Sequence, residues 1–316
     1  MTTNNTKGHD FTMNAATSPI AANLGQIGYR ADDGGHVVDA PAAEWARTLR
    51  SLRKLGIEQI DPTDMWVPLG DLRDDRRAEF SRVLADEGLS IPSISLTRHS
   101  IVDPEAGDAN LETVHRYLDI APEFGASVVN IGFMEALTEE QKTALWFWLA
   151  DGHQDDKALR PKAVERVREL ADHAASNGLL LSLEMYEDTF LGTPDEAVAF
   201  VQDVDHAAVG LNPDIGNLVR LHRDIEDVEA MFEKVLPMSN FWHVKNYSRD
   251  HDPATGAYAT SPQPLKYGYI NYRKVFGRAI ELGFDGVICC EHYGADSIGV
   301  VAENMAYVRD VLDYWS

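Results

Sequence analysis

The sequence predicts an α/β fold, a (β/α)8 TIM barrel in which eight parallel strands close into a ring inside a ring of helices. Three observations predict it. Short apolar runs alternate with segments of helical periodicity, and eight such runs can be found along the chain. The chain of 316 residues, 44% of them hydrophobic, has the core of one large domain. A second domain is unnecessary, because single barrels commonly reach this length.

The expected strands are short apolar runs bounded by turn residues or polar side chains. In chain order they are Gly25–Arg30, Ile57–Asp61, Ser93–Thr97, Val128–Phe133, Leu179–Glu184, Val209–Asn212, Phe241–Lys245 and Gly286–Glu291. Between them, residues 42–56, 77–88, 111–125, 163–178 and 194–204 place apolar side chains at helical spacing, with glycine at several of the ends. Repeated strand and helix alternation predicts a parallel sheet.

Two segments fall outside this alternation. Residues 1–20 are expected to be a flexible tail without the basic and apolar regions of a signal peptide, which leaves residues 21–316 as the single catalytic domain. The Pro-containing stretch 250–271 is long for a strand-to-helix connection and is expected to be an irregular loop. No run approaches the roughly 18 apolar residues of a membrane span, so no membrane partner is expected.

The net charge and the cysteine content limit which classes of partner and which cellular compartment are expected. The net charge is −23, from 28 basic and 51 acidic residues. Nucleic-acid affinity comes largely from Lys and Arg, so nucleic acid is not an expected partner. The only cysteines, Cys289 and Cys290, are adjacent and cannot link distant segments. This predicts a reduced, cytoplasmic protein with both thiols in the core.

Four potential metal ligands each lie at the end of a short apolar run. They are Glu184 in LLLSLEMYED, Asp214 in VGLNPDIGN, His243 in SNFWHVKNY and Glu291 in GVICCEHYG. The carboxyl ends of barrel strands meet at one mouth, so these side chains are expected to converge there. Three carboxylates and one imidazole suit a hard divalent ion. Each residue taken alone could instead be a satisfied polar group at a strand end.

With these residues the chain resembles the xylose isomerase-like superfamily of sugar isomerases, epimerases and endonuclease IV. The resemblance covers nearly the whole chain. It implies that Glu184, Asp214, His243 and Glu291 bind one divalent ion, Mn²⁺ first, with Mg²⁺, Co²⁺ or Zn²⁺ as alternatives. It also implies that the two glutamates exchange a proton with the substrate. A bound ion that polarises a sugar carbonyl acidifies the adjacent C–H and stabilises the resulting anion.

Two features point to a variant within the superfamily. Many members have Asp-x-x-His after the sixth strand, whereas this chain has Asp214 followed three residues later by Asn217, which carries no charge. The fourth connection, residues 137–163, is extended and contains Trp146, Phe147 and Trp148. These features resemble the α subunits of C-glycoside deglycosidases, which implies a lyase that cleaves 3-keto C-glycosides of aromatic aglycones. A smaller β subunit in a hetero-oligomer would then be a partner.

Alternatives remain open at this stage. The same first step serves a ketose 3-epimerase or a sugar phosphate isomerase, and a non-catalytic sugar-binding barrel would need no metal. The catalytic candidates are Glu184, Glu291, His153 and Lys245, and the candidate substrate-binding residues are Asn217, His99, Trp66, Tyr186 and His292. Strand alternation puts Tyr186 on the side of Glu184 and Lys245 on the side of His243. Lys245 could equally be a salt-bridged barrel residue, and Trp66 could be a lid that contacts no ligand.

Overall fold

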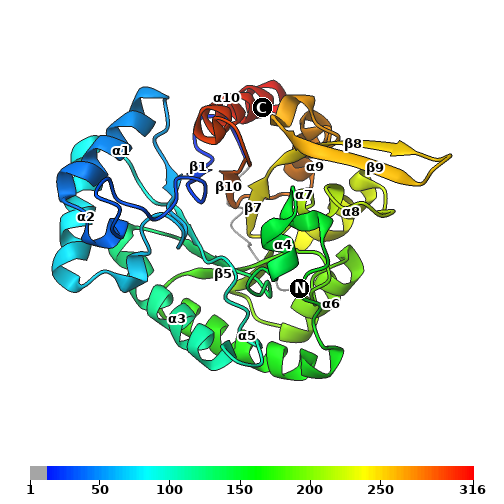
Figure 1. Cartoon of the computed structure of the whole chain (residues 1–316), viewed down its shortest axis with the longest axis horizontal. Helices are drawn as coiled ribbons and strands as arrows, with labels where there is room; N and C mark the ends of the chain where they lie inside the picture. The colour runs from blue at the N-terminus through cyan, green and yellow to red at the C-terminus, as the bar shows by residue number, and fades with distance from the viewer. Residues whose placement is uncertain (1–12) are drawn as a thin grey trace, which may run out of the picture.

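A closed eight-stranded parallel barrel forms the centre of the molecule, as Figure 1 shows for the computed structural model, which describes residues 13–316. Its strands are β1 (Ile20–Asn23), β2 (Ile60–Asp61), β3 (Ser93–Ser95), β4 (Val128–Ile131), β5 (Leu180–Glu184), β6 (Val209–Asn212), β7 (Phe241–Val244) and β10 (Val287–Cys290). They pair in two arcs, β2–β1–β10–β7 and β3–β4–β5–β6. Parallel bridges Gln59–Ser90 and Leu211–Ser239 join the arcs. The predicted TIM barrel is therefore confirmed.

The main helices surround this ring (Figure 1). They are α1 (Ala42–Lys54), α2 (Asp74–Glu87), α3 (Gly107–Ile120), α5 (Arg160–Ser176), α6 (Pro194–Val204), α8 (Val228–Val235), α9 (Tyr272–Glu281) and α10 (Ser297–Trp315). Helix α1 illustrates their packing, because it buries Trp45, Leu49 and Leu52 along one face. Two short helices, α4 (Glu139–Thr143) and α7 (Gly216–Val219), lie in the connections after β4 and β6.

The first strand lies earlier in the chain than the sequence predicts. The expected strand Gly25–Arg30 is wrong, since residues 25–27 form a turn and Gly28 has φ +80°. The actual strand, β1, is the small-residue run Ile20–Asn23, which is fully enclosed between β10 and β2. The predicted tail of residues 1–20 ends too late for the same reason. Met13 is already buried, and residues 1–12 lie outside the described part of the chain.

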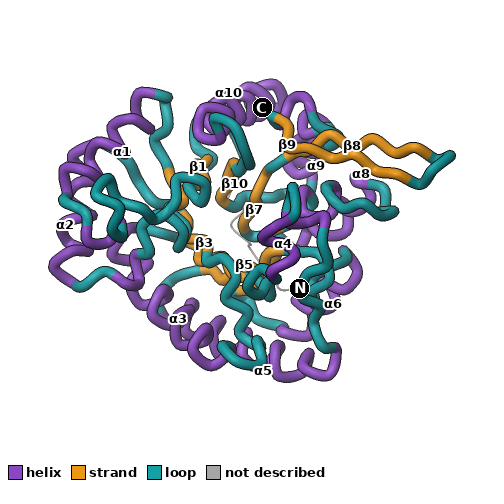
Figure 2. Tube along the Cα trace, in the orientation of Figure 1, coloured by secondary structure: helices purple, strands orange, loops and turns teal. Residues whose placement is uncertain are grey.

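The segment expected to be an irregular loop contains most of a regular antiparallel hairpin. Strands β8 (Asn246–Asp252) and β9 (Ala257–Gln263) pair over seven residues each, and Figure 2 shows them extending away from the barrel. The tight connection between them uses Gly256 at φ +72°. Pro262 pairs opposite Tyr247 near the barrel, so proline in this segment did not prevent strand pairing.

Burial agrees with the prediction that both thiols lie in the core. Cys289 and Cys290 are both free and buried. Among the described residues, no helix is both long enough and apolar enough to cross a membrane. The cytoplasmic location and the absence of nucleic acid remain predictions.

Candidate active site

The four predicted ligand residues converge at one end of the barrel. Glu184 is the last residue of β5, His243 lies within β7, and Glu291 directly follows β10. Asp214 comes two residues after β6. The Nδ1 atom of His243 lies 3.4 Å from Glu184 Oε2, 3.6 Å from Glu291 Oε2 and 3.8 Å from Asp214 Oδ2. One imidazole nitrogen thus faces three carboxylates at the same point.

The unsatisfied atoms at this point fit a metal ion. Asp214 is fully buried, yet its Oδ1 accepts no hydrogen bond from the described residues, and its Oδ2 contacts only the Lys245 ammonium at 2.8 Å. His243 Nδ1 also lacks a hydrogen-bond partner among them. Buried polar atoms are normally paired, so atoms left free at one point indicate a ligand. Carboxylate oxygens and a neutral imidazole can hold Mg²⁺ or Mn²⁺.

Two amides fix the orientation of Glu184. Asn130 on β4 donates to Oε2 at 3.0 Å, and Asn217 donates to Oε1 at 3.2 Å. Asn217 also donates to the backbone carbonyl of Met185 at 2.9 Å. Asn217 therefore supports a ligand residue, a role that its position in the sequence does not predict. It also lines the pocket that lies above the four ligand residues. Groups that orient the ligands in this way tune a metal site.

The tautomer of His243 follows from its other nitrogen. The Ser95 hydroxyl donates to Asp61 at 2.8 Å, so its lone pairs are available to accept a hydrogen bond from His243 Nε2, which lies 3.1 Å away. A ring that donates from Nε2 leaves Nδ1 as the free lone pair in its neutral form. Nδ1 is the atom that faces the carboxylates. One ring nitrogen of His243 is thus held by Ser95, and the other is free to bind a metal ion.

Lys245 lies within the same cluster. Its ammonium is 2.8 Å from Asp214 Oδ2 and 3.0 Å from Glu291 Oε2, and the side chain is almost completely buried. The close approach depends on Gly216, where an added Cβ would lie 2.5 Å from Lys245 Cγ and 3.2 Å from Asp214 Oδ1. The salt-bridged alternative for Lys245 is therefore observed, and the side chain also lines the pocket above the cluster.

The charges perturb one another strongly. Burial lowers the pKa of His243, but the carboxylates of Glu184, Glu291 and Asp214 outweigh it and raise that pKa to about 9. Burial raises the pKa of Asp214 above its ordinary value, against the effect of Lys245. Burial also opposes ionisation of Glu184, yet the neighbouring His243 lowers the pKa of this carboxyl. Without an ion, the cluster therefore holds a proton on His243 near neutral pH.

An open pocket of about 380 Å³ lies above the cluster, and we call it the main pocket. Glu184, His243 and Glu291 line it, and so do Tyr186 and Lys245, as strand alternation predicts. Tyr293 lines it as well. The aromatic residues of the fourth connection form part of its wall. Trp146 stacks on Trp148 at 4.9 Å, and Phe147 contacts Tyr293 edge to face at 6.1 Å. The extended fourth connection therefore brings these aromatic side chains to the barrel mouth.

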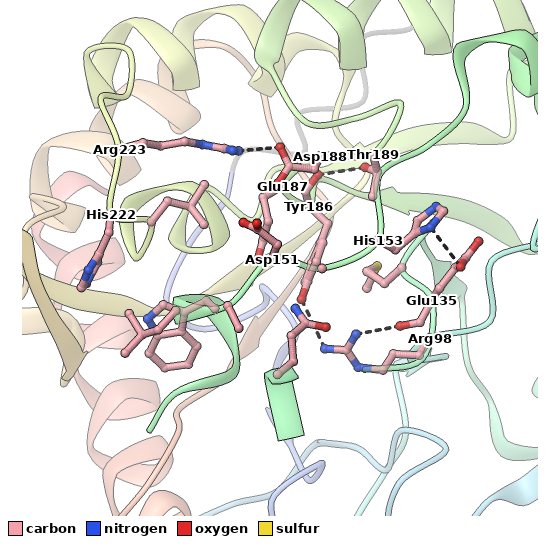
Figure 3. Close-up of a pocket in the computed structure, with 17 residues that line it drawn as sticks. Arg98, Glu135, Asp151, His153, Tyr186, Glu187, Asp188, Thr189, His222 and Arg223 are labelled. Carbon is pink, nitrogen blue, oxygen red and sulfur yellow. Dashed lines mark hydrogen bonds and ion pairs between the residues drawn. The ribbon is translucent and has the colours of Figure 1, made fainter. Parts of the chain in front are cut away.

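His153 lies in a different cavity, drawn in Figure 3, which we call the adjoining pocket. Its Nδ1 is 3.0 Å from Glu135 and its Nε2 is 2.9 Å from Asp155. The hydrogen bond that His153 donates to Asp155 raises the pKa of His153, against the effect of burial. His153 does not line the main pocket, so the structure separates this catalytic candidate from Glu184 and Glu291.

Three other candidates also lie away from the main pocket. Trp66 is wrong as a substrate wall, because it is 2% exposed and packs in the core against Phe80 at 5.9 Å. His99 binds Asp64 at 2.7 Å and lines neither pocket. His292 is buried beside Glu291 but does not line the main pocket either.

Sequence reasoning also missed residues that the site uses. Asn130 and Ser95 support the ligands from β4 and β3, and a polar residue inside each of these strands was the available signal. Arg98 lines both pockets, has φ +61°, and donates to the backbone carbonyl of Glu135 and to the hydroxyl of Tyr186. An arginine beside a histidine at a strand end gave no signal of this backbone geometry.

Comparison with known proteins identifies the family. The model of the xylose isomerase-like TIM barrel matches residues 49–314. The chain belongs to this family. A solved family member from Mycobacterium smegmatis, described as a xylose isomerase-like TIM barrel protein in complex with magnesium, is 63% identical over 96% of this chain and 99% of its own, with a TM-score of 0.94. The fold and the superfamily predicted from sequence are thus confirmed.

More distant members have named activities. The L-ribulose-5-phosphate 3-epimerase UlaE of Salmonella typhi is 21% identical over 281 residues, which cover 85% of this chain and 89% of the relative. The D-psicose 3-epimerase of Clostridium cellulolyticum H10, solved with D-tagatose, is 16% identical over 94% of this chain and 98% of its own, with a TM-score of 0.63. These names favour the epimerase alternative over C-deglycosylation, which none of them describes.

Proposed function

We propose that this chain is a divalent-metal-dependent ketose epimerase that inverts the carbon next to the sugar carbonyl. The observation that carries the proposal is the convergence of Glu184, Asp214, His243 and Glu291 beside an open pocket, with Asp214 Oδ1 and His243 Nδ1 left without hydrogen bonds among the described residues. The epimerase names of the more distant relatives support the same reaction class.

The four converging residues would hold the ion. Mg²⁺ and Mn²⁺ are the candidates, because the donor set is rich in oxygen and the 63% identical relative was solved with magnesium. When bound, the ion polarises the substrate carbonyl and stabilises negative charge that develops on its oxygen. Asn130 and Asn217 keep Glu184 aimed at the site, and Ser95 keeps His243 in the required tautomer.

The placement of the two glutamates suits inversion. Glu184 belongs to the β3–β4–β5–β6 arc, whereas Glu291 follows β10 in the other arc. Carboxylates that approach a substrate from different sides of the barrel can remove a proton from one face and return a proton to the other. Lys245, paired with Glu291 and Asp214, places a positive charge beside the reacting oxygens.

The elimination favoured from the sequence loses its main supports. His153, one catalytic candidate, lies in the adjoining pocket and is held between two carboxylates. Lys245, the other candidate besides the two glutamates, does line the main pocket but is paired with Asp214 and Glu291. Asn217 replaces the histidine of the usual Asp-x-x-His pattern, and its amide donates a hydrogen bond to Glu184. Phe147 and its two tryptophan neighbours line the main pocket, but they suit a sugar ring as well as an aglycone. The expected β subunit remains a prediction.

The test is turnover with and without metal. Purified protein would be stripped with a chelator, reloaded with Mg²⁺ or Mn²⁺, and offered free ketoses, L-ribulose 5-phosphate and a 3-keto C-glycoside in parallel. We expect inversion at C3 of a ketose only in the loaded protein, and at least about 100-fold less in Glu184→Gln. Aglycone release without inversion would replace the proposal with the lyase. A loaded protein that transforms none of these substrates would favour a sugar-binding barrel.

A further inference from the structure

Arg98 is a half-buried arginine that lines the main pocket and forms no ion pair within the described part of the chain. Its guanidinium donates to the backbone carbonyl of Glu135 at 2.8 Å and to the hydroxyl of Tyr186 at 3.2 Å, as Figure 3 shows. A guanidinium carries five N–H groups, so three of them remain without a partner among the described residues. Arg98 therefore has both a charge and hydrogen-bond donors left for a ligand.

The backbone of Arg98 is held in an unfavourable conformation. Its φ of +61° lies in the left-handed region, which is disfavoured for a residue with a Cβ atom. The ring of Phe147 packs against the guanidinium at 5.3 Å and, with the two hydrogen bonds, fixes the direction of the side chain. Such backbone outliers persist only where their surroundings enforce them, and they gather at ligand sites. The guanidinium is thus placed before a ligand arrives.

Two neighbours of Arg98 in the lining of the main pocket also present donors. Gln141 is 7% exposed, and its Oε1 accepts from the backbone N–H of Thr138 at 3.1 Å, whereas its Nε2 has no hydrogen-bond partner among residues 13–316. Burial raises the pKa of Tyr186, so its hydroxyl stays protonated and can donate as well as accept from Arg98. An ionised phosphate or carboxylate only accepts hydrogen bonds, whereas each sugar hydroxyl brings a proton that needs an acceptor. This group of donors therefore suits an oxyanion.

The charges of the two pockets decide on which side of Arg98 an anion would bind. The adjoining pocket is lined by four carboxylates, those of Glu135, Asp151, Glu187 and Asp188. Among the described residues that line the main pocket, the only carboxylates are those of Glu184 and Glu291 at the metal site, where Lys245 and a bound divalent ion balance them. The charge of Arg98 is then uncompensated on this side. Like charges repel, so an anion is favoured in the main pocket and disfavoured in the adjoining one.

We propose that the main pocket selects a ketose with an oxyanion, either a phosphate or a carboxylate, at the end far from its reacting carbon, and that Arg98 is the specificity-determining residue that binds it. The inference rests on the proposed function, since the carbonyl end of the ketose would lie at Glu184 and Glu291. Tyr186 comes two residues after Glu184, in the direction in which β5 leaves the barrel. Arg98, bonded to Tyr186, therefore faces the part of the sugar that lies farther out.

The experiment compares Kd values for two matched pairs of ketoses, measured by calorimetry on the Mg²⁺-loaded full chain. L-ribulose and L-ribulose 5-phosphate differ by a phosphate, whereas D-fructose and D-fructuronate differ by oxidation of C6 to a carboxylate. We expect the anionic member of at least one pair to bind about 10–100-fold more tightly than its neutral partner, because hydrogen bonds between charged groups are the stronger ones. The pair with the larger ratio identifies the anion as a phosphate or a carboxylate.

Substitution of Arg98 tests its role. Arg98→Gln should reduce the ratio to about twofold or less while the Kd of the neutral ketose stays within about twofold, and Arg98→Lys, which keeps the charge, should retain part of the ratio. Neither glutamine nor lysine changes the strain at φ +61°, because both carry a Cβ atom. The exposed Arg82 of α2, which donates to the backbone of its own helix, provides the matched control. Arg82→Gln removes the same charge and should leave the ratio unchanged.

The outcomes separate this inference from the proposed function. Equal Kd values within both pairs in the wild type would overturn the anion site, whether or not a ketose is epimerised, and this measurement needs no variant. An equal effect of Arg98→Gln on neutral and anionic ketoses would make Arg98 a structural residue and would also overturn the inference. A preference for an anionic ketose that Arg98→Gln removes, without inversion of any ketose, would uphold the anion site and overturn the epimerase.

Discussion

Two buried aspartates at the same end of the barrel have opposite surroundings. Asp61 ends β2, and its carboxylate accepts hydrogen bonds from the hydroxyls of Ser93 (2.7 Å) and Ser95 (2.8 Å) and from the backbone N–H of Ser95 (2.9 Å) and Thr63 (3.0 Å). Asp214 is equally buried but has only the ion pair with Lys245. A carboxylate that accepts four hydrogen bonds is structural, whereas Asp214, which contacts a single ammonium, keeps lone pairs for a ligand.

The comparison also decides between two groupings of metal-binding side chains. Asp61, His243 and Cys289 lie as close together as Glu184, Asp214 and His243 do, with all ligand atoms of each group within 4.8 Å. However, the lone pairs of Asp61 are already used, and burial raises the pKa of the Cys289 thiol well above its ordinary value. A protonated thiol is a poor ligand. Glu184, Asp214 and His243 are therefore the grouping that forms the candidate metal site.

The largest expected effect is the loss of a ligand. Asp214→Asn should reduce kcat/KM and Mg²⁺ affinity by more than about 100-fold, because even residues that merely orient a ligand are worth 10–100-fold. Asp61→Asn should instead place an amide against four donors and reduce the free energy of unfolding by about 1–3 kcal/mol. Calorimetric metal titration and chemical denaturation of both variants measure this contrast. Equal loss of metal binding in the two variants would remove the distinction between the aspartates.

Lys245→Met is expected to have the next largest effect. Without the ammonium, the buried carboxylates of Asp214 and Glu291 lose their nearest cation and only the protonated His243 faces them, which costs about 3–5 kcal/mol of stability in the metal-free protein. Mg²⁺ should restore most of this loss by supplying positive charge, while kcat stays about 10–100-fold lower if Lys245 stabilises the reacting oxygen. Denaturation curves with and without Mg²⁺ give the first quantity. A loss of stability that Mg²⁺ does not reduce would contradict metal binding at this point.

The pH dependence of stability tests the state of His243. In the metal-free protein its pKa is raised from 6.5 to about 9, so protonation stabilises the fold fully below pH 6.5 and this contribution is lost as pH rises through 9. Mg²⁺ binds the neutral ring of His243, so the affinity for the ion should rise as the ring loses its proton between pH 6.5 and 9. The stability gained on adding Mg²⁺ should therefore increase between pH 6.5 and 9. A gain that is constant with pH, or one that persists in His243→Gln, would contradict this assignment.

Trp66→Phe should have the smallest effect on activity. The side chain is in the core against Phe80, away from both pockets, so kcat/KM should stay within about twofold while the free energy of unfolding falls by about 1–3 kcal/mol. Steady-state kinetics and denaturation measure the two effects. A large rise in KM would return Trp66 to the substrate site.

The sequence predicts the ligand residues better than their supports. Glu184 and His243 were found because each follows or interrupts an apolar strand, and parallel strands bring such positions to one mouth. Asn130 and Ser95 act on them from other strands, and only the closure of the barrel brings these side chains together. The backbone of Arg98 at φ +61° has no local sequence signal.

The errors in the predicted secondary structure have local causes. The first strand was placed at Gly25–Arg30, because the small side chains of Ile20–Asn23 gave a weaker apolar pattern. These small residues fit because β10 and β2 enclose the strand on both sides. The hairpin was missed because its proline content favours a loop, although pairing with Asn246–Asp252 outweighs that preference.

Solvent exchange at the reacting carbon tests the central claim most directly. The ketose found to turn over would be incubated in D₂O with the Mg²⁺-loaded protein and followed by NMR, with metal-free protein and Glu184→Gln as controls. The account predicts that deuterium enters at C3 together with the inverted product, and only in the loaded wild type. Inversion without deuterium in the product, or exchange that continues undiminished without the ion, would contradict proton transfer at the Glu184, Asp214, His243 and Glu291 site.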